Sequence, residues 1–133
     1  MQSKGRSKIF PLKIVFPGIV TPSRNQLDRW QRMGYYSNIQ RSKKTYWNIL
    51  LLCNAHDDKY KAKPKEKRGV DFYSYRPRKL DDDNLSGGMK YFRDTLEDMG
   101  LIWRDSPSYL EANYYQQTDG KDPRTEIIIY LWS

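Results

Sequence analysis

Three consecutive aspartates, Asp81, Asp82 and Asp83, stand before Asn84 at the end of a strand-like run that reaches Leu80. On an extended backbone, side chains two positions apart lie on the same face. We therefore expect Asp81 and Asp83 to point the same way, with Asp82 opposite. Two carboxylates on one face repel unless a cation lies between them or one takes up a proton. In a chain of net charge +8, this spacing indicates a site for a divalent metal ion.

The residues after the aspartates predict one helix that ends at Gly100. Its apolar residues recur at steps of three and four, which is typical of one helix face: Leu85, Met89, Phe92, Leu96 and Met99. Either Asp83 or Asn84 is suited to cap its start. Gly87 and Gly88 are unfavourable inside a helix, by about 1 kcal/mol each relative to alanine. We therefore expect another backbone or a ligand to approach them closely.

A wider pattern connects these residues to others downstream. The order Asp81-x-Asp83-Asn84, Lys90-x-x-x-Asp94-x-Leu96, Gly100 and Trp103-x-Asp105-Ser106 resembles the RusA family of Holliday junction resolvases (crossover junction endodeoxyribonucleases). The resemblance covers about residues 70–130, with a weaker similarity at Pro22-Ser23-Arg24-Asn25. It implies a small α/β homodimer that nicks four-way DNA junctions with Mg²⁺, for which Mn²⁺ is a possible substitute.

The resemblance also implies roles for individual residues. By position, Asp81, Asp83 and Asp105 match the metal-binding acids, and Lys90 matches the catalytic lysine. The chain differs from the family pattern in two places. Residues 86–88 add about one helical turn before Lys90, and Arg104 stands where the family usually has the first of two acidic residues.

Each of these residues also has a structural explanation that the sequence leaves open. Asp83 can simply cap the helix, with its acidic neighbours favoured by the helix dipole. Lys90 and Asp94 are four positions apart and can form an exposed ion pair, and Asp105 can begin a turn. The alternative function is a non-catalytic nucleic-acid-binding protein that binds through its basic N-terminal half.

Charge is divided unevenly along the chain. Residues 1–80 contain 19 lysines and arginines against 5 acidic residues, whereas residues 81–133 contain 5 against 11. A basic half joined to an acidic half that contains the aspartates suggests a polyanion-binding surface beside a cation site. The candidate DNA contacts are a pair after the first strand, a lysine-rich loop and the cations before the aspartates: Arg24, Asn25, Lys61, Lys63, Lys65, Arg76, Arg78 and Lys79.

Length and pattern predict a single domain over residues 1–133, of mixed α/β (α+β) class, with a small mixed sheet of about four strands packed with two main helices. Strands are expected within 9–20, 70–80, 109–117 and 125–132, the last two as a hairpin. Helices are expected within 26–36 and 42–60. Residues 1–8 are expected to form a disordered basic tail.

The cysteine content and the absence of long apolar runs indicate the cellular compartment. The single cysteine, Cys53, excludes an intramolecular disulfide and fits a reducing compartment. No apolar run reaches membrane-spanning length, and the N-terminus lacks a signal-peptide core. We expect a cytoplasmic, nucleoid-associated protein that binds branched DNA, with no membrane partner and no small-molecule cofactor.

Overall fold

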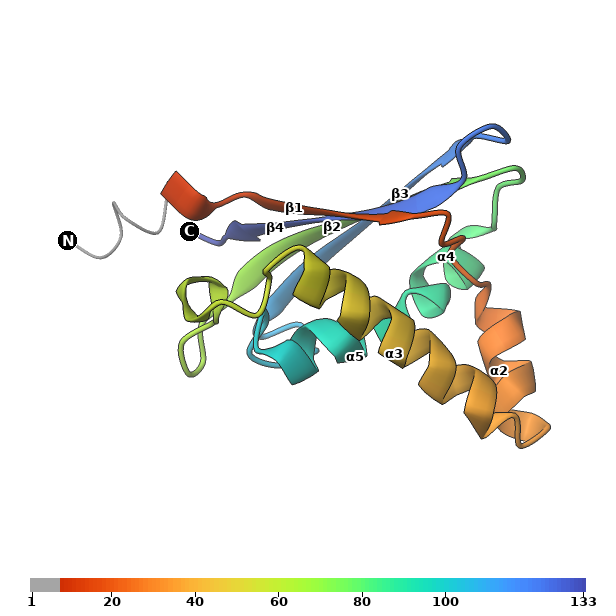
Figure 1. Ribbon diagram of the computed structural model, residues 1–133, viewed down its shortest axis with the longest axis horizontal. Helices are drawn as coiled ribbons and strands as arrows, with labels where there is room; N and C mark the ends of the chain where they lie inside the picture. Colours follow the sequence, from red (N-terminus) through yellow and green to blue (C-terminus); the bar gives the residue numbers. More distant parts are fainter. Residues whose placement is uncertain (1–7) are drawn as a thin grey trace.

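A four-stranded mixed sheet forms the centre of the protein (Figure 1). The computed structural model describes residues 8–133, so the predicted tail lies outside the described residues apart from Lys8. Across the sheet the strands run in the order β1 (Leu12–Pro17), β4 (Arg124–Leu131), β2 (Arg68–Arg76) and β3 (Leu110–Thr118). β4 is antiparallel to both of its neighbours, and β2 and β3 are parallel. The predicted fold class is confirmed.

Helices cover one face of this sheet and one of its ends. Figure 1 shows α3 (Tyr36–Leu52) and α5 (Lys90–Met99) beside one face, with α2 (Arg24–Arg32) and α4 (Asp82–Gly88) toward one end. A short 3₁₀ helix, Asp58–Tyr60, precedes β2. None of the helices within residues 8–133 has the length and apolar composition that crossing a membrane requires.

The core lies between the sheet and these helices. Val70, Phe72 and Ser74 of β2 are buried toward the helices, whereas Asp71 and Tyr73 are only half-buried. This alternation follows the period of two of a β-strand, which was predicted within residues 70–80. The side chains that complete the core from β4, α3 and α5 include Ile127, Ile129, Leu50, Phe92 and Leu96.

The last two strands do not form the predicted hairpin. β2 lies between them, in parallel register with β3 from Arg68↔Leu110 to Arg76↔Thr118 and antiparallel to β4. Parallel strands need a long crossover connection, and α4 and α5 form the connection between β2 and β3. The carboxyl ends of β2 and β3 therefore lie side by side, next to the start of α4.

The single helix predicted after the aspartates is two helices, with the break at Met89. The apolar stripe itself is correct, because all five of its residues are buried: Leu85, Met89, Phe92, Leu96 and Met99. Gly100 ends α5 in the left-handed conformation (φ 85°), as predicted from its position.

Two further boundaries differ from the prediction. α3 spans Tyr36–Leu52 rather than 42–60, and it buries Tyr46 and Leu50 while Trp47 stays 37% exposed. β2 ends at Arg76 rather than at Leu80, since Pro77 has no N–H to donate to a neighbouring strand.

Candidate active site at the start of α4

Asp81 is the N-cap of α4 and not the end of a strand. Its carboxylate accepts a hydrogen bond from the Asn84 N–H at 3.0 Å, and Asp82 is the first helical residue. Asp82 and Asp83 are helical, so the backbone is not extended through all three aspartates. The extended backbone from which a shared face of Asp81 and Asp83 was predicted is therefore wrong, and the predicted cap at Asp83 or Asn84 is wrong as well. All three aspartate side chains are exposed.

The segment before Asp81 is held in place by β3. The side-chain amide of Gln116 accepts from the Leu80 N–H at 2.9 Å and donates to the Leu80 carbonyl at 2.6 Å. This double contact sets where the chain enters α4. The two residues are 36 positions apart, so no local sequence signal pointed to Gln116.

The segment Pro22–Asn25 packs directly against the start of α4. The Asn25 N–H donates to the side-chain oxygen of Asn84 at 3.0 Å. A Cβ atom placed on Gly88 would lie 1.8 Å from the Pro22 carbonyl oxygen, which leaves no room for any other residue there. The prediction of a close backbone approach at Gly88 is confirmed, and the segment Pro22–Asn25 lies against the start of α4.

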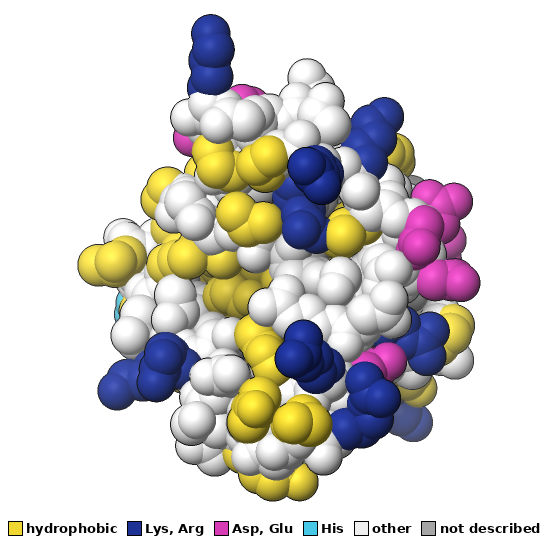
Figure 2. All heavy atoms as spheres, turned by 90° about the vertical axis from the view of Figure 1, so that its right-hand side faces the viewer, with side chains coloured by type: hydrophobic (Ala, Val, Ile, Leu, Met, Phe, Trp, Pro, Cys, Tyr) yellow, Lys and Arg dark blue, Asp and Glu magenta, His cyan; other side chains and the backbone are white. Residues whose placement is uncertain are grey.

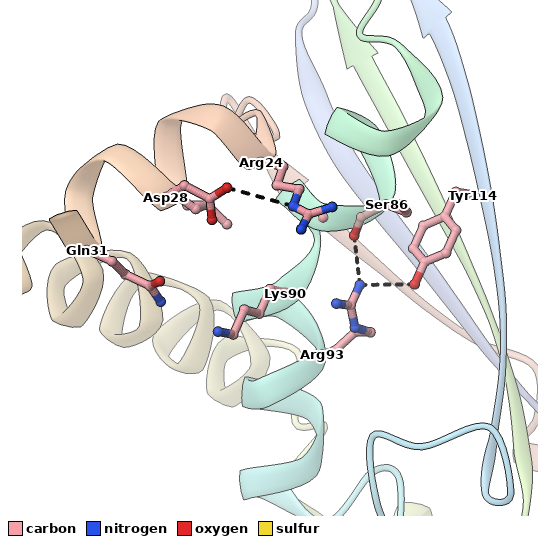
Figure 3. Close-up of a pocket in the computed structure, with 9 residues that line it drawn as sticks. Arg24, Asp28, Gln31, Ser86, Lys90, Arg93 and Tyr114 are labelled. Carbon is pink, nitrogen blue, oxygen red and sulfur yellow. Dashed lines mark hydrogen bonds and ion pairs between the residues drawn. The ribbon is translucent and has the colours of Figure 1, made fainter.

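A pocket of about 390 Å³ opens between α2, α4, α5 and β3. Figure 3 shows Lys90 projecting from α5 toward α2, with Arg24 above it beside Asp28. Arg24 forms a 3.7 Å ion pair with Asp28, and both side chains are more than half exposed. The pocket therefore brings together two of the predicted site residues, Arg24 and Lys90.

The ion pair between Lys90 and Asp94, considered as an alternative, does not form. Asp94 pairs instead with Lys43 of α3 at 3.3 Å. Lys43 also lies 5.1 Å from the ring centroid of Tyr91. Lys90 is exposed and lines the pocket described above.

Arg93 connects the pocket to Asp105. Its Nη1 donates to the Ser86 carbonyl at 2.8 Å and to the Tyr114 hydroxyl at 2.9 Å, as drawn in Figure 3. Its Nε donates to Asp105 Oδ2 at 3.1 Å. Burial raises the pKa of Tyr114, and the charge and hydrogen bond of Arg93 oppose that rise. Sequence reasoning missed Arg93, whose only signal was its place three residues after Lys90.

The described side chains do not form the predicted three-carboxylate cluster. Within residues 8–133, no group of three or more His, Cys, Asp or Glu side chains is placed to hold one metal ion. Asp81 and Asp83 offer exposed carboxylate oxygens, and Mg²⁺ is commonly held by one or two carboxylates with waters and substrate phosphate. The donor chemistry at the start of α4 fits Mg²⁺, while Asp105 is engaged by Arg93.

The predicted basic residues divide between the two ends of the sheet. The loop with Lys61, Lys63 and Lys65 lies at the end opposite α2 and α4 in Figure 1, and Lys61 pairs with Asp58 at 3.2 Å. β2 has nine residues between the two ends, or about 30 Å of extended chain. By contrast, Arg24 and Asn25 pack at the start of α4, while Arg78 and Lys79 are exposed just before Leu80.

Comparison of this chain with models of known protein families and with curated protein sequences gave no match.

Proposed function

We propose that this protein is a Mg²⁺-dependent, structure-selective endodeoxyribonuclease that resolves four-way DNA junctions by paired nicking of symmetric strands, in DNA recombination and repair. The observation that carries the proposal is the bond between the Asn25 N–H and Asn84, 59 positions apart. It holds the Pro22–Asn25 segment on the aspartate-rich helix start. Acidic groups, Lys90 and Arg24 are thereby gathered at one end of the molecule, in the motif order that resembles the RusA family.

Phosphodiester hydrolysis requires an activated water, neutralisation of the phosphate and stabilisation of the leaving oxygen. Held by an exposed carboxylate of Asp81 or Asp83, with waters and the substrate phosphate as its other ligands, Mg²⁺ would supply the first two. Lys90 and Arg24 line one pocket from two helices, so they can hold a phosphate oxygen between them and stabilise its developing charge. Arg78 and Lys79 are exposed beside the aspartates and can hold the neighbouring phosphates.

A second candidate function is non-catalytic binding of nucleic acid. The ion pair between Arg93 and Asp105 favours it, because a carboxylate neutralised by an arginine needs no metal ion. In that account the acids of α4 stabilise the helix start, as the bond from the Asn84 N–H to Asp81 does. The basic residues would then bind DNA without cutting it.

Replacement of Asp83 separates the two functions. Asp83→Asn removes a carboxylate with little change of shape, so nicking of a labelled four-way junction in Mg²⁺ should be abolished. Binding of the junction in EDTA should be unchanged or tighter, because one negative charge near the DNA is lost. The measurements are strand cleavage on denaturing gels and binding by fluorescence anisotropy.

Asp98→Asn is the matched control, since Asp98 is an exposed aspartate of α5 that lines neither the Lys90 pocket nor the pocket beside Asp105. It makes the same change of charge and should nick like the wild type. An Asp83→Asn protein that also nicks at the wild-type rate would remove Asp83 from the site.

A further inference from the structure

A second pocket, of about 480 Å³, lies on the helix-covered side of the sheet. It is enclosed by the loop before α2, by α2 and α3, and by the end of β2. Arg76 and Arg41 line it together with Gln26, Trp30 and Tyr46, and none of its lining residues is acidic. Figure 2 shows this end of the molecule, with hydrophobic side chains around a hollow, Lys and Arg near its rim and acidic side chains gathered to one side.

The guanidinium group of Arg76 is incompletely satisfied inside this pocket. Its Nε and Nη1 atoms are buried and have no hydrogen-bond partner, and burial lowers its pKa. Neither Arg76 nor Arg41 has an ion-pair partner among residues 8–133. Arg93, by contrast, bonds to three groups. A buried donor left without a partner is costly, so the geometry favours an anion as the missing partner.

We propose that this pocket binds a backbone phosphate of DNA, with Arg76 and Arg41 as its partners. Arginine is well suited to a phosphate, because its planar group donates two parallel hydrogen bonds. Arg41 and Gln26 line the pocket and are exposed, so a polymer can reach it. Pro22 lines the pocket and also contacts Gly88 of α4. A strand held there would therefore pass close to the aspartates.

The choice of DNA as the source of the phosphate rests on the proposed function. The positive charge of the pocket, which favours an anion, is independent of that function. The experiment is therefore done in EDTA, where no cleavage occurs. Binding of a fluorescent four-way junction is measured for Arg76→Gln, for Arg41→Gln and for the double variant. Arg104→Gln is the control, because Arg104 is an exposed arginine stacked on Trp103 (4.2 Å) and does not line the pocket.

Each pocket variant should weaken junction binding by about tenfold, the effect of losing one charged hydrogen bond. Each should also reduce the slope of log K against log salt concentration by about 0.9. Inorganic phosphate, compared with chloride at equal ionic strength, should displace the junction from the wild type but not from the double variant. Arg104→Gln should change neither the affinity nor this competition.

Arg41 is exposed, so its replacement tests the pocket without affecting the core. Arg76→Gln removes a buried and unpaired charge, so its melting temperature should not fall. The proposal would be overturned if both pocket variants bind the junction as tightly as Arg104→Gln does. The proposal would also be overturned if inorganic phosphate binds in the pocket without displacing DNA, because the pocket would then be a site for a small anion only. A chain that binds DNA through this pocket but never nicks it would contradict the proposed function alone.

Discussion

Arg93 is the side chain on which the assignment of Asp105 depends. It contacts the end of α4, the Tyr114 hydroxyl of β3 and the Asp105 carboxylate at once. The sequence pattern predicted a metal-binding role for Asp105 from its place after Trp103. The spacing of residues could not predict that an arginine of the preceding helix pairs with Asp105. A metal ligand and the ion-pair partner of an arginine are both carboxylates, so the residue type at Asp105 fits either role. Only a variant of Asp105 distinguishes the two roles.

Asp105→Asn makes this distinction. The ion pair is partly exposed, with 30% of the Asp105 side chain accessible, so its loss should lower the free energy of unfolding by less than about 1 kcal/mol. If Asp105 contributes to the site, junction cleavage in Mg²⁺ should be lost despite this small change. Chemical denaturation and single-turnover nicking measure the two effects. Nicking at the wild-type rate would leave Asp105 as a partner of Arg93 only.

At the scale of elements, the sequence predicted local features better than long-range ones. The apolar stripe of α4 and α5, the end at Gly100 and the close contact at Gly88 follow from short spacing and were found. The position of β2 between β3 and β4 was not predicted, because Asp119-Gly120 between two strand-like runs is typical of a hairpin. In the structure the Asp119 N–H donates to the Arg76 carbonyl at 2.7 Å, and the turn passes the end of β2.

The contact between α4 and the Pro22 segment can be tested with a methyl group. In Gly88→Ala the new Cβ would meet the Pro22 carbonyl oxygen at 1.8 Å. Because a backbone atom cannot move aside cheaply, the free energy of unfolding should fall by about 1–3 kcal/mol, with cleavage reduced as well. At Gly120 a Cβ would meet nothing within 4 Å, so Gly120→Ala should be close to neutral in thermal melts. Equal stability of the two variants would contradict the packing described here.

The pairing of β1 and β4 should make stability depend on pH. Burial alone would raise the pKa of Glu126, but a hydrogen bond from Arg124 (2.6 Å) and the hydrogen bond and charge of Lys13 (3.1 Å) outweigh burial and lower it. A lowered folded-state pKa stabilises the protein above the ordinary value of 4.5, and this contribution is lost as the pH falls through the folded-state value. Glu126→Gln should show a smaller loss of stability between pH 6 and acid, measured by urea unfolding. An unchanged pH profile would exclude this contribution.

At the scale of the whole molecule, the basic residues form two separate regions rather than one surface. The lysine-rich loop lies at the end of the sheet opposite the aspartates (Figure 1). Phosphate contacts made by this loop should contribute to binding and not to cleavage. Neutralising Lys61, Lys63 and Lys65 together should therefore reduce the slope of log K against log salt concentration for junction binding by up to about 3. The nicking rate at saturating protein should not change. A slower rate at saturation would place the loop near the chemistry and contradict this separation.

Resolution of a junction requires cuts in two strands related by two-fold symmetry, and a chain with one acidic segment provides one site. We therefore predict a C₂ homodimer, which is the commonest soluble oligomer. Sedimentation at micromolar concentration should detect it. A protein that stays monomeric, both free and on a junction, would leave paired cleavage without a second site.

The most direct measurement of the central claim is incubation with a four-way junction whose strands are labelled one at a time. With Mg²⁺, we predict nicks at matching positions in two opposite strands and ligatable linear products. With EDTA or with Asp83→Asn, the junction should be bound but intact. A junction that is bound in Mg²⁺ and never cut would contradict the proposed nuclease activity and favour the non-catalytic DNA-binding protein.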